Sequence, residues 1–322
     1  MHGFLNLDKP KGISSAEAVR RVKKIVGPHK VGHGGTLDPG ATGILPIVIG
    51  SATRFSEEFL RMRKVYVATA TLGISTDSYD AEGAITFRAE RNEINKIDGS
   101  LVSEGLDRLI MSQRIQSVDL GKSETPIMQR PPIFSALKKG GVAAHKLARQ
   151  NKPIDLDPRR VSIYRWKTGD VKRASGELPQ VEIEIECGRG FYVRSLVHDL
   201  GEFLGCGAHL ADLRRTQVGN FVINEAIELE KVSLLGGEKL VKKLILPIDK
   251  ILESWPAVIL RSWEIRDLGF GQSIILSPHR RYVSTGFDVD FLRAYGPAGE
   301  LVAVLERDFG VGLWKSYKYL SK

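Results

Sequence analysis

Asp38 is the residue whose surroundings are best suited to chemistry. It lies between Leu37 and Pro39 within residues 31–50, a segment with six glycines and two prolines. Proline restricts φ beside the carboxylate, and glycine leaves room for a ligand next to the backbone. Such a carboxylate suits a nucleophile or a general base. Its local sequence alone favours a plainer interpretation, an Asx-turn aspartate before a proline.

Other patterns of reactive residues do not complete a known site. The glycine-rich segment has neither the spacing of a P-loop nor the third glycine of a dinucleotide-binding fingerprint. Asp77, Asp80 and Glu82 do not match a calcium-binding loop, so we expect a turn with local capping bonds. Three residues are spread like metal ligands, but a predicted helix separates the first from the others and a fourth ligand is missing: His198, Cys206 and His209. We therefore expect no metal site.

Two segments alternate in the manner of β-strands, residues 64–72 and residues 178–187. One face of the first carries Tyr66, Ala68, Ala70 and Leu72, and the inward face of the second carries Val181, Ile183, Ile185 and Cys187. A shorter strand is predicted from Phe4 to Leu7, before turn residues at positions 9–12.

Two segments have helical spacing instead. Ser14 and Glu17 have capping-box spacing, and the helix that follows them has one basic face and an apolar face formed by Val19, Val22, Ile25 and Val26. After the glycine turn at residues 188–190, apolar residues repeat at helical spacing from Val193 to Leu204. This spacing places Arg194 in the first helical turn.

The composition is that of a folded, basic protein. The 322 residues include 47 Lys and Arg against 38 Asp and Glu, which gives a net charge of +9 and favours a polyanionic partner such as nucleic acid. Two cysteines exclude a disulfide framework and fit a reducing compartment. Neither a signal peptide nor a membrane-spanning run is apparent. We expect a cytoplasmic protein without membrane contact.

The pattern changes near Pro247 to short strand-like runs separated by turn residues, such as Tyr282–Ser284 and Leu301–Leu305. We therefore predict two domains, residues 1–246 and a small β-rich domain at residues 247–322. Periodicity alone predicts a chain that contains both helices and strands.

Several segments together resemble one family. GHGGTLDPGATGILP (residues 32–46) closely resembles the catalytic loop of the TruB family, the bacterial tRNA pseudouridine-55 synthases. Further segments agree with that family in order and spacing: NLDKPKGISS (6–15), KVY (64–66) with TDSYDAEG (76–83), QRPPIFSALK (129–138), GFYVRSL (190–196), GCGAHL (205–210) and LRRT (213–216). The resemblance covers roughly residues 3 to 220.

The resemblance implies an α+β pseudouridine synthase fold, with a mixed, mostly antiparallel sheet, flanking helices and a PUA-like C-terminal domain. It also implies a reaction, in which uracil is detached from ribose C1′ at N1 and rejoined through C5 without a metal or an organic cofactor. The implied substrate is uridine 55 in the T-loop of tRNA, with no guide RNA. We expect the protein to be a monomer.

Roles for individual residues follow from the same resemblance. Asp38 attacks either the sugar C1′ or the base, and the cation of Arg194 favours its ionised form. Tyr66 stacks on the extruded uracil and assists proton loss from C5, although an aromatic side chain on an alternating strand is equally typical of a core. Four residues are implied to line the pocket, with packing as the alternative for each: His33, Lys9, Tyr192 and Leu200.

The chain departs from the family pattern in places. Gly34 stands where the family loop usually has threonine, which predicts a lost hydroxyl contact and a looser loop. Residues 142–147 lack a tyrosine often found there, which puts one RNA contact in doubt. The C-terminal region resembles the family only weakly, through Gly271–Gln272 and the final strands.

Two other functions remain open on the sequence. One is an RNA-binding or RNA-folding protein whose catalysis is secondary, suggested by the basic stretches and the C-terminal domain. The other is a guide-RNA-dependent synthase of the related archaeal and eukaryotic branch. The chain starts only a few residues before Asp8, which favours the stand-alone type, and activity without a guide distinguishes the two.

Overall fold

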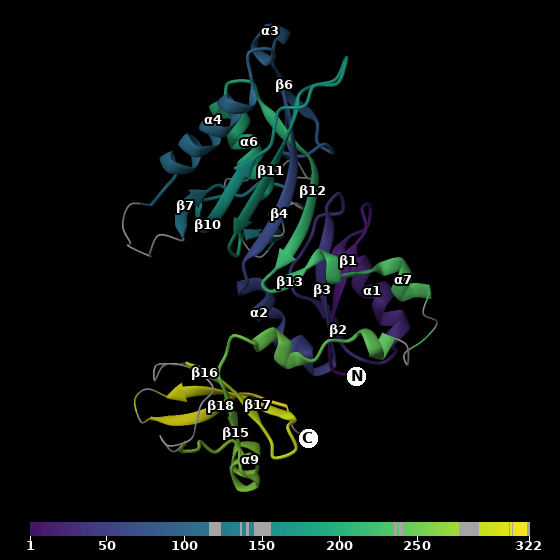
Figure 1. Ribbon diagram of the computed structural model, residues 1–322, viewed down its shortest axis with the longest axis vertical. Coiled ribbons are helices and arrows are strands. Elements are labelled where there is room, and N and C mark those ends of the chain that lie inside the picture. The colour runs from purple at the N-terminus through teal and green to yellow at the C-terminus, as the bar shows by residue number, and fades with distance from the viewer. Residues whose placement is uncertain are drawn as a thin grey trace.

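A ten-stranded sheet forms the body of the molecule, and a four-stranded sheet lies at one end of it (Figure 1). This computed structural model describes residues 1–115, 124–135, 137–139, 142–144, 156–234, 237, 241–276, 290–308, 310 and 312–320. The large sheet has the order β14 (Ile227–Glu228), β1 (Gly3–Lys9), β3 (Thr42–Ile49), β12 (Ala208–Val218), β4 (Lys64–Leu72), β11 (Gln180–Cys187), β10 (Arg159–Thr168) and β7 (Thr125–Gln129). Two shorter strands pair beside this path, β2 (Val31–His33) with β3 and β13 (Phe221–Val222) with β12.

The sheet is mixed and mostly antiparallel, as predicted. The β1–β14 and β12–β3 pairs are parallel, whereas β4 runs antiparallel to both of its neighbours, β12 and β11. The predicted alternation of β11 is confirmed, because its four apolar side chains are at most 1% exposed while the glutamates between them reach the surface: Val181, Ile183, Ile185 and Cys187. The β4 prediction is confirmed in the same way by Ala68, Ala70 and Leu72.

Helices cover one face of this sheet. α1 (Ser15–Val26) and α7 (Leu229–Leu234) lie over the β1 end, and α4 (Gly99–Ser112) and α6 (Val193–Phe203) lie over the β10 end (Figure 1). The predicted start of α1 is confirmed, since the Ser14 side chain accepts a hydrogen bond from the backbone N–H of Glu17 at 3.1 Å. The predicted helix of residues 193–204 is confirmed as α6, with Arg194 in its first turn.

The opposite face of β1 and β3 carries a second apolar cluster. Phe4 and Val48 point into it, together with Phe59 from α2 (Ser56–Arg61), which follows the 3₁₀ helix η1 (Gly50–Phe55). Phe4, Phe59 and Phe221 pack at centroid distances of 4.9–5.8 Å. This cluster also receives Val304 of the small sheet, so both sheets share it.

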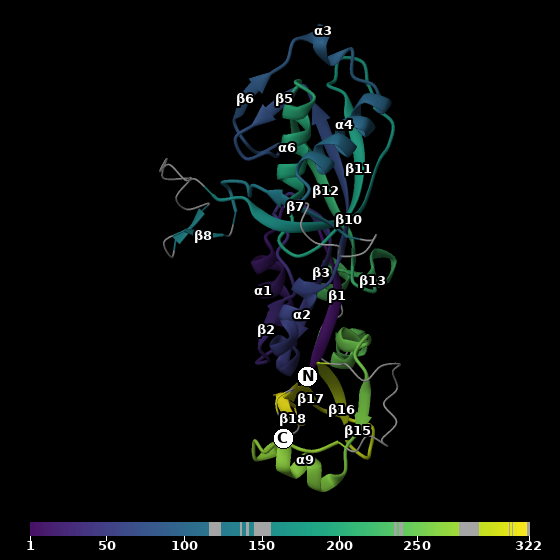
Figure 2. The ribbon, with the colours of Figure 1, turned by 90° about the vertical axis from the view of Figure 1, so that its left-hand side faces the viewer.

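The small sheet confirms a β-rich C-terminal region. It has the order β15 (Ala257–Ile259), β16 (Phe291–Tyr295), β17 (Leu301–Asp308) and β18 (Leu313–Tyr319), with α9 (Ser262–Gly269) beside it (Figure 2). Polar contacts hold it to η1 and α2, where Arg54 donates to the Tyr319 carbonyl at 2.7 Å and Lys318 lies 3.8 Å from Glu58. The predicted run Leu301–Leu305 lies in β17, whereas Tyr282–Ser284 falls outside the described residues.

The remaining elements are short: β5 (Ile74–Thr76), β6 (Ile85–Arg88), α3 (Arg91–Ile94), β8 (Lys138–Lys139), β9 (Val142–Ala143), η2 (Ile223–Glu225), η3 (Lys242–Leu244) and η4 (Ile248–Leu252). Within the described part of the chain, none of the helices combines the length and apolar character needed to span a bilayer. The division into residues 1–246 and 247–322 stays a prediction.

Candidate active site

Asp38 lies in the loop between β2 and β3, and its carboxylate faces Arg194 of α6. Arg194 Nη2 is 3.0 Å from Asp38 Oδ2. The two side chains differ in exposure, since Asp38 is 46% exposed and Arg194 only 7%. A buried guanidinium thus presents one edge to a carboxylate that solvent and a ligand can reach. The arrangement places a cation directly beside a carboxylate that can act as a nucleophile.

Backbone carbonyls and a second carboxylate fix Arg194 in place. Nη1 donates to the Ser78 carbonyl at 3.2 Å and Nη2 to the Phe134 carbonyl at 3.0 Å, while Asp80 Oδ2 lies 3.5 Å from Nη1. The expected capping turn is confirmed, because Asp80 Oδ1 accepts from Ser78 Oγ at 2.6 Å and from the Glu82 N–H at 3.1 Å. The sequence indicated the turn but not its contact with Arg194.

The backbone on either side of Asp38 is anchored by groups far away in the sequence. Ser15 Oγ, at the start of α1, donates to the Leu37 carbonyl at 2.9 Å and accepts from the Leu37 N–H at 2.8 Å. Lys9 Nζ donates to the carbonyls of Pro10 at 2.8 Å, Ile13 at 2.9 Å and Pro39 at 3.4 Å. These contacts hold the backbone and leave the Asp38 carboxylate available.

Lys9 therefore occupies a different position from the one expected of a pocket-lining residue. It is fully buried, and burial lowers its pKa to about 8, an effect that the negative charge of Asp38 partly opposes. Its ammonium group donates to two backbone carbonyls of the turn that follows β1 and to the Pro39 carbonyl of the Asp38 loop. We infer that Lys9 acts on the site by holding the loop.

Tyr66 lies on β4, directly opposite Arg215 of β12 in the strand register. Arg215 Nη1 is 3.4 Å from the Tyr66 hydroxyl, and its guanidinium carbon is 5.9 Å from the ring centroid. Burial raises the pKa of Tyr66, while the Arg215 cation opposes that shift. The negative charge of Asp38 makes a smaller contribution that raises the same pKa.

His33 and Tyr192 also lie beside this loop. His33 ends β2, its Nδ1 is 3.3 Å from the Gly35 N–H, and burial followed by the Arg215 charge lowers its pKa. Tyr192 precedes α6 and exchanges two hydrogen bonds with the Gln129 side chain, at 2.8 and 2.9 Å. Burial raises the pKa of Tyr192, and the Asp38 charge contributes in the same direction.

Leu200 is placed elsewhere. Its side chain is fully buried in the main core, on the part of α6 that packs against α4 near Gly105. The described structure thus brings together Asp38, Arg194 and Tyr66, with Lys9, His33 and Tyr192 around them, and gives Leu200 a packing position. The helical repeat of α6 already assigned Leu200 to the apolar face.

Gly34 explains a close approach within the loop. A Cβ built on this glycine would lie 2.5 Å from the Cβ of Phe59, and its N–H donates to the Pro46 carbonyl at 2.8 Å. The space of the usual threonine is therefore filled by the phenylalanine of α2. The expected looser loop is not what the structure shows, because this position is packed and hydrogen-bonded.

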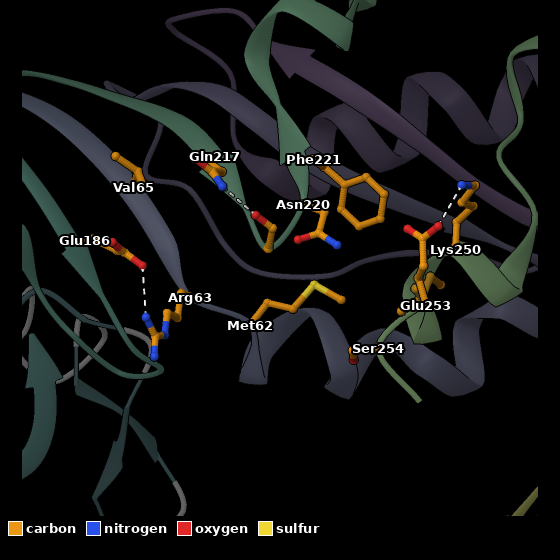
Figure 3. A pocket seen from close by; sticks show the side chains of 12 residues that line it. Met62, Arg63, Val65, Glu186, Gln217, Asn220, Phe221, Lys250, Glu253 and Ser254 are labelled. Carbon is orange, nitrogen blue, oxygen red and sulfur yellow. Dashed lines mark hydrogen bonds and ion pairs between the residues drawn. The ribbon is translucent and has the colours of Figure 1, made fainter. Parts of the chain in front are cut away.

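A cavity of about 360 Å³ lies away from these residues, between the ends of β4 and β12 and the segment around η4 (Figure 3). Its charged walls are paired with each other, Arg63 with Glu186 at 3.4 Å and Lys250 with Glu253 at 3.0 Å. Since these charges already have partners, we assign the cavity no ligand.

No group of three or more His, Cys, Asp or Glu side chains in the described residues is arranged to hold a metal ion. His198 instead stacks on Tyr79, with ring centroids 3.8 Å apart, and His209 Nδ1 contacts the Ile74 carbonyl at 2.9 Å. These histidines therefore have structural partners.

This chain is similar to known proteins over most of its length. Residues 23–193 match the family described as TruB family pseudouridylate synthase (N terminal domain), and residues 194–253 match the tRNA pseudouridylate synthase B C-terminal domain. The tRNA pseudouridine synthase B of Clostridioides difficile (strain 630) is 38% identical over 321 residues, 99% of this chain and 96% of the relative. That of Pseudomonas aeruginosa (strain UCBPP-PA14) is 40% identical over 261 residues, 80% and 78% of the two chains.

Solved structures share the fold as well. A chain of a Cbf5-Nop10-Gar1 complex superposes with a TM-score of 0.64 at 26% identity, over 95% of this chain and 78% of that chain. A chain of an H/ACA RNP bound to a substrate RNA superposes with a TM-score of 0.66 at 24% identity, over 100% and 86%. These neighbours support the pseudouridine synthase fold.

Proposed function

Because this chain belongs to the TruB family of pseudouridylate synthases, we propose that it isomerises uridine 55 in the T-loop of tRNA to pseudouridine. One observation carries the proposal: the accessible carboxylate of Asp38 is held 3.0 Å from the buried guanidinium of Arg194, in a loop anchored through its backbone. The net charge of +9 suits a polyanionic substrate.

The reaction moves one bond and two protons. The bond between N1 of uracil and C1′ of ribose breaks, and a bond between C5 and C1′ forms. The proton on C5 is lost, and N1 ends with a proton, so atoms and charge balance. Asp38 provides the carboxylate that attacks either C1′ or the base, and Arg194 holds that carboxylate in place through their ion pair.

The target base must leave the RNA stack before it reaches Asp38. Extrusion costs a few kcal/mol, and stacking on an aromatic ring returns roughly 1–3 kcal/mol per base. Tyr66 offers such a ring on β4, and its hydroxyl is oriented by Arg215. In our proposal Tyr66 stacks on the uracil, and its hydroxyl assists the loss of the C5 proton.

The remaining pocket residues take supporting roles in this proposal. His33, at the end of β2, fills the space that the extruded base vacates, and Tyr192, before α6, borders the base. Lys9 acts through the loop backbone. We propose that the C-terminal sheet is a PUA-like RNA-binding domain and that a cytoplasmic monomer acts on tRNA without a guide RNA.

The test is a modification map. Unmodified tRNA transcript and purified protein are incubated without any other RNA, and pseudouridine is located by carbodiimide labelling and primer extension. We expect a single stop that corresponds to position 55. A transcript with cytidine at position 55 is the control and should give no stop. Modification elsewhere, or modification that needs an added guide RNA, would contradict the proposal.

The same experiment separates the catalytic function from an RNA-folding function. A protein whose main role is RNA binding would retain its full effect on tRNA structure after Asp38→Asn. If turnover is absent in the wild-type protein while salt-dependent tRNA binding persists, the RNA-binding function replaces the proposed one.

A further inference from the structure

Arg215 is a buried cation in the LRRT segment (213–216), and the sequence assigned it no role. Its side chain is 2% exposed, and no carboxylate within the described residues forms an ion pair with its guanidinium. Burying an arginine without an anionic partner is costly, so its donors need well-placed acceptors. Those acceptors show what the residue holds.

Two of the acceptors belong to the loop that carries Asp38, and a third lies in β3, shortly after that loop. Nε donates to the Ile44 carbonyl at 2.7 Å, Nη2 to the Gly35 carbonyl at 3.1 Å and Nη1 to the Thr36 carbonyl at 3.4 Å. The fourth contact is the Tyr66 hydroxyl, 3.4 Å from Nη1. One guanidinium therefore joins the start of the Asp38 loop, the strand that follows the loop and the tyrosine of β4.

A glycine of β3 makes this approach possible. Gly43 lies opposite Arg215 in the strand register with φ of +101°, and a Cβ there would lie 2.2 Å from the Arg215 carbonyl oxygen. At Gly35 a Cβ would make only an ordinary contact, 3.6 Å from Nη1, so glycine is favoured there by its φ of +147°. The close packing around Arg215 thus requires glycine at position 43.

We propose that Arg215 is a positioning residue, which sets the Asp38 loop against the Tyr66 hydroxyl for the isomerisation. This inference rests on the proposed function. A planar guanidinium can bond several acceptors in fixed directions, which a lysine ammonium cannot reproduce. Its charge has a second effect, because it opposes the rise that burial causes in the pKa of Tyr66.

The experiment compares Arg215→Lys, Tyr66→Phe and the double variant in single-turnover assays on tRNA transcript, after thermal melting has confirmed that each is folded. We expect Arg215→Lys to lower the rate of the chemical step by roughly 10- to 100-fold, with the affinity for tRNA changed less than about threefold. The loss should be clearly smaller in the Tyr66→Phe background, because part of it acts through the hydroxyl.

Arg214→Lys is the matched control. It is the same substitution one residue earlier in β12, where the side chain is 40% exposed and pairs with Asp8 at 2.7 Å. We expect its single-turnover rate to stay within about threefold of wild type, since partly exposed ion pairs contribute little.

Hydrogen–deuterium exchange gives a readout that does not depend on activity. In Arg215→Met, amides of residues 35–44 should exchange faster than in the wild-type protein, with Arg215→Lys in between. Two results would overturn the inference. One is an unchanged exchange rate of these amides, and the other is a rate loss in the Arg215→Lys/Tyr66→Phe variant equal to the product of the two single losses. A wild-type protein that fails to modify position 55 while this exchange difference is present would instead refute the proposed function.

Discussion

The close packing of Gly34 against Phe59 predicts that Gly34→Ala lowers the stability of the protein, because the cost of the clash exceeds the usual gain from replacing glycine. Replacing a glycine by alanine in a compatible backbone stabilises a protein by about 0.4–1 kcal/mol through the unfolded state. At Gly34 the added Cβ would lie 2.5 Å from Phe59 Cβ, a clash that no rotamer of Phe59 relieves. Overpacking of this kind costs about 1–3 kcal/mol. We therefore expect Gly34→Ala to destabilise the protein by about 1–2 kcal/mol.

Gly32→Ala is the control, because its added Cβ would meet only Val48 at 3.5 Å, an ordinary contact. We expect that variant to be neutral or slightly stabilised. Urea unfolding of both variants measures the difference, together with Phe59→Ala and the Gly34→Ala/Phe59→Ala pair. The pair should lose less stability than the two single losses combined, since removing the ring lets α2 adjust. Equal stabilities of Gly32→Ala and Gly34→Ala would refute the packing argument.

Three further predictions concern the site and its supports. Burial lowers the pKa of Lys9 and Lys64 to about 8, so the unfolded chain binds more protons than the folded one between about pH 8 and 10.5. The free energy of unfolding should therefore rise with pH from 8 to 10, by up to about 3 kcal/mol per lysine over the full interval. In urea unfolding measured across this pH range, Lys64→Met should show a smaller rise than the wild-type protein. Leu200→Ala should cost about 2–5 kcal/mol in urea unfolding with little change in the affinity of the folded protein for tRNA, and a large loss of affinity at unchanged stability would return Leu200 to the pocket. Tyr66→Phe should keep tRNA binding but slow the chemical step by about 10²- to 10⁴-fold, and an unchanged single-turnover rate would exclude its hydroxyl from proton transfer.

Helices and strands that have a clear periodic pattern of apolar residues could be predicted from the sequence. The alternation in β11 and the helical repeat in α6 each required only neighbouring residues, and both elements formed where expected. The pairing of Asp38 with Arg194 came from family resemblance and not from periodicity, because 156 positions separate the two residues. Their 3.0 Å contact is consistent with that expectation.

Residues whose role depends on distant backbone groups were harder to predict. Arg215 lies on β12 among polar residues, so no pattern indicated a buried cation bound to carbonyls some 170–180 positions earlier in the chain. Lys9 was expected in the pocket, and its Nζ is instead enclosed by carbonyls of its own turn and of Pro39. A hydrogen-bonding partner provided by a backbone carbonyl leaves no mark in the sequence.

The proposed catalysis depends most on the carboxylate of Asp38, which Asp38→Asn removes while keeping the shape of the side chain. Single-turnover conversion of uridine 55 and tRNA affinity are measured for this variant and for Asp170→Asn, which changes an exposed aspartate elsewhere. We predict that Asp38→Asn binds tRNA as tightly as the wild-type protein and loses at least about 10³-fold in rate, while Asp170→Asn is unaffected. Conversion by Asp38→Asn at the wild-type rate would contradict the account.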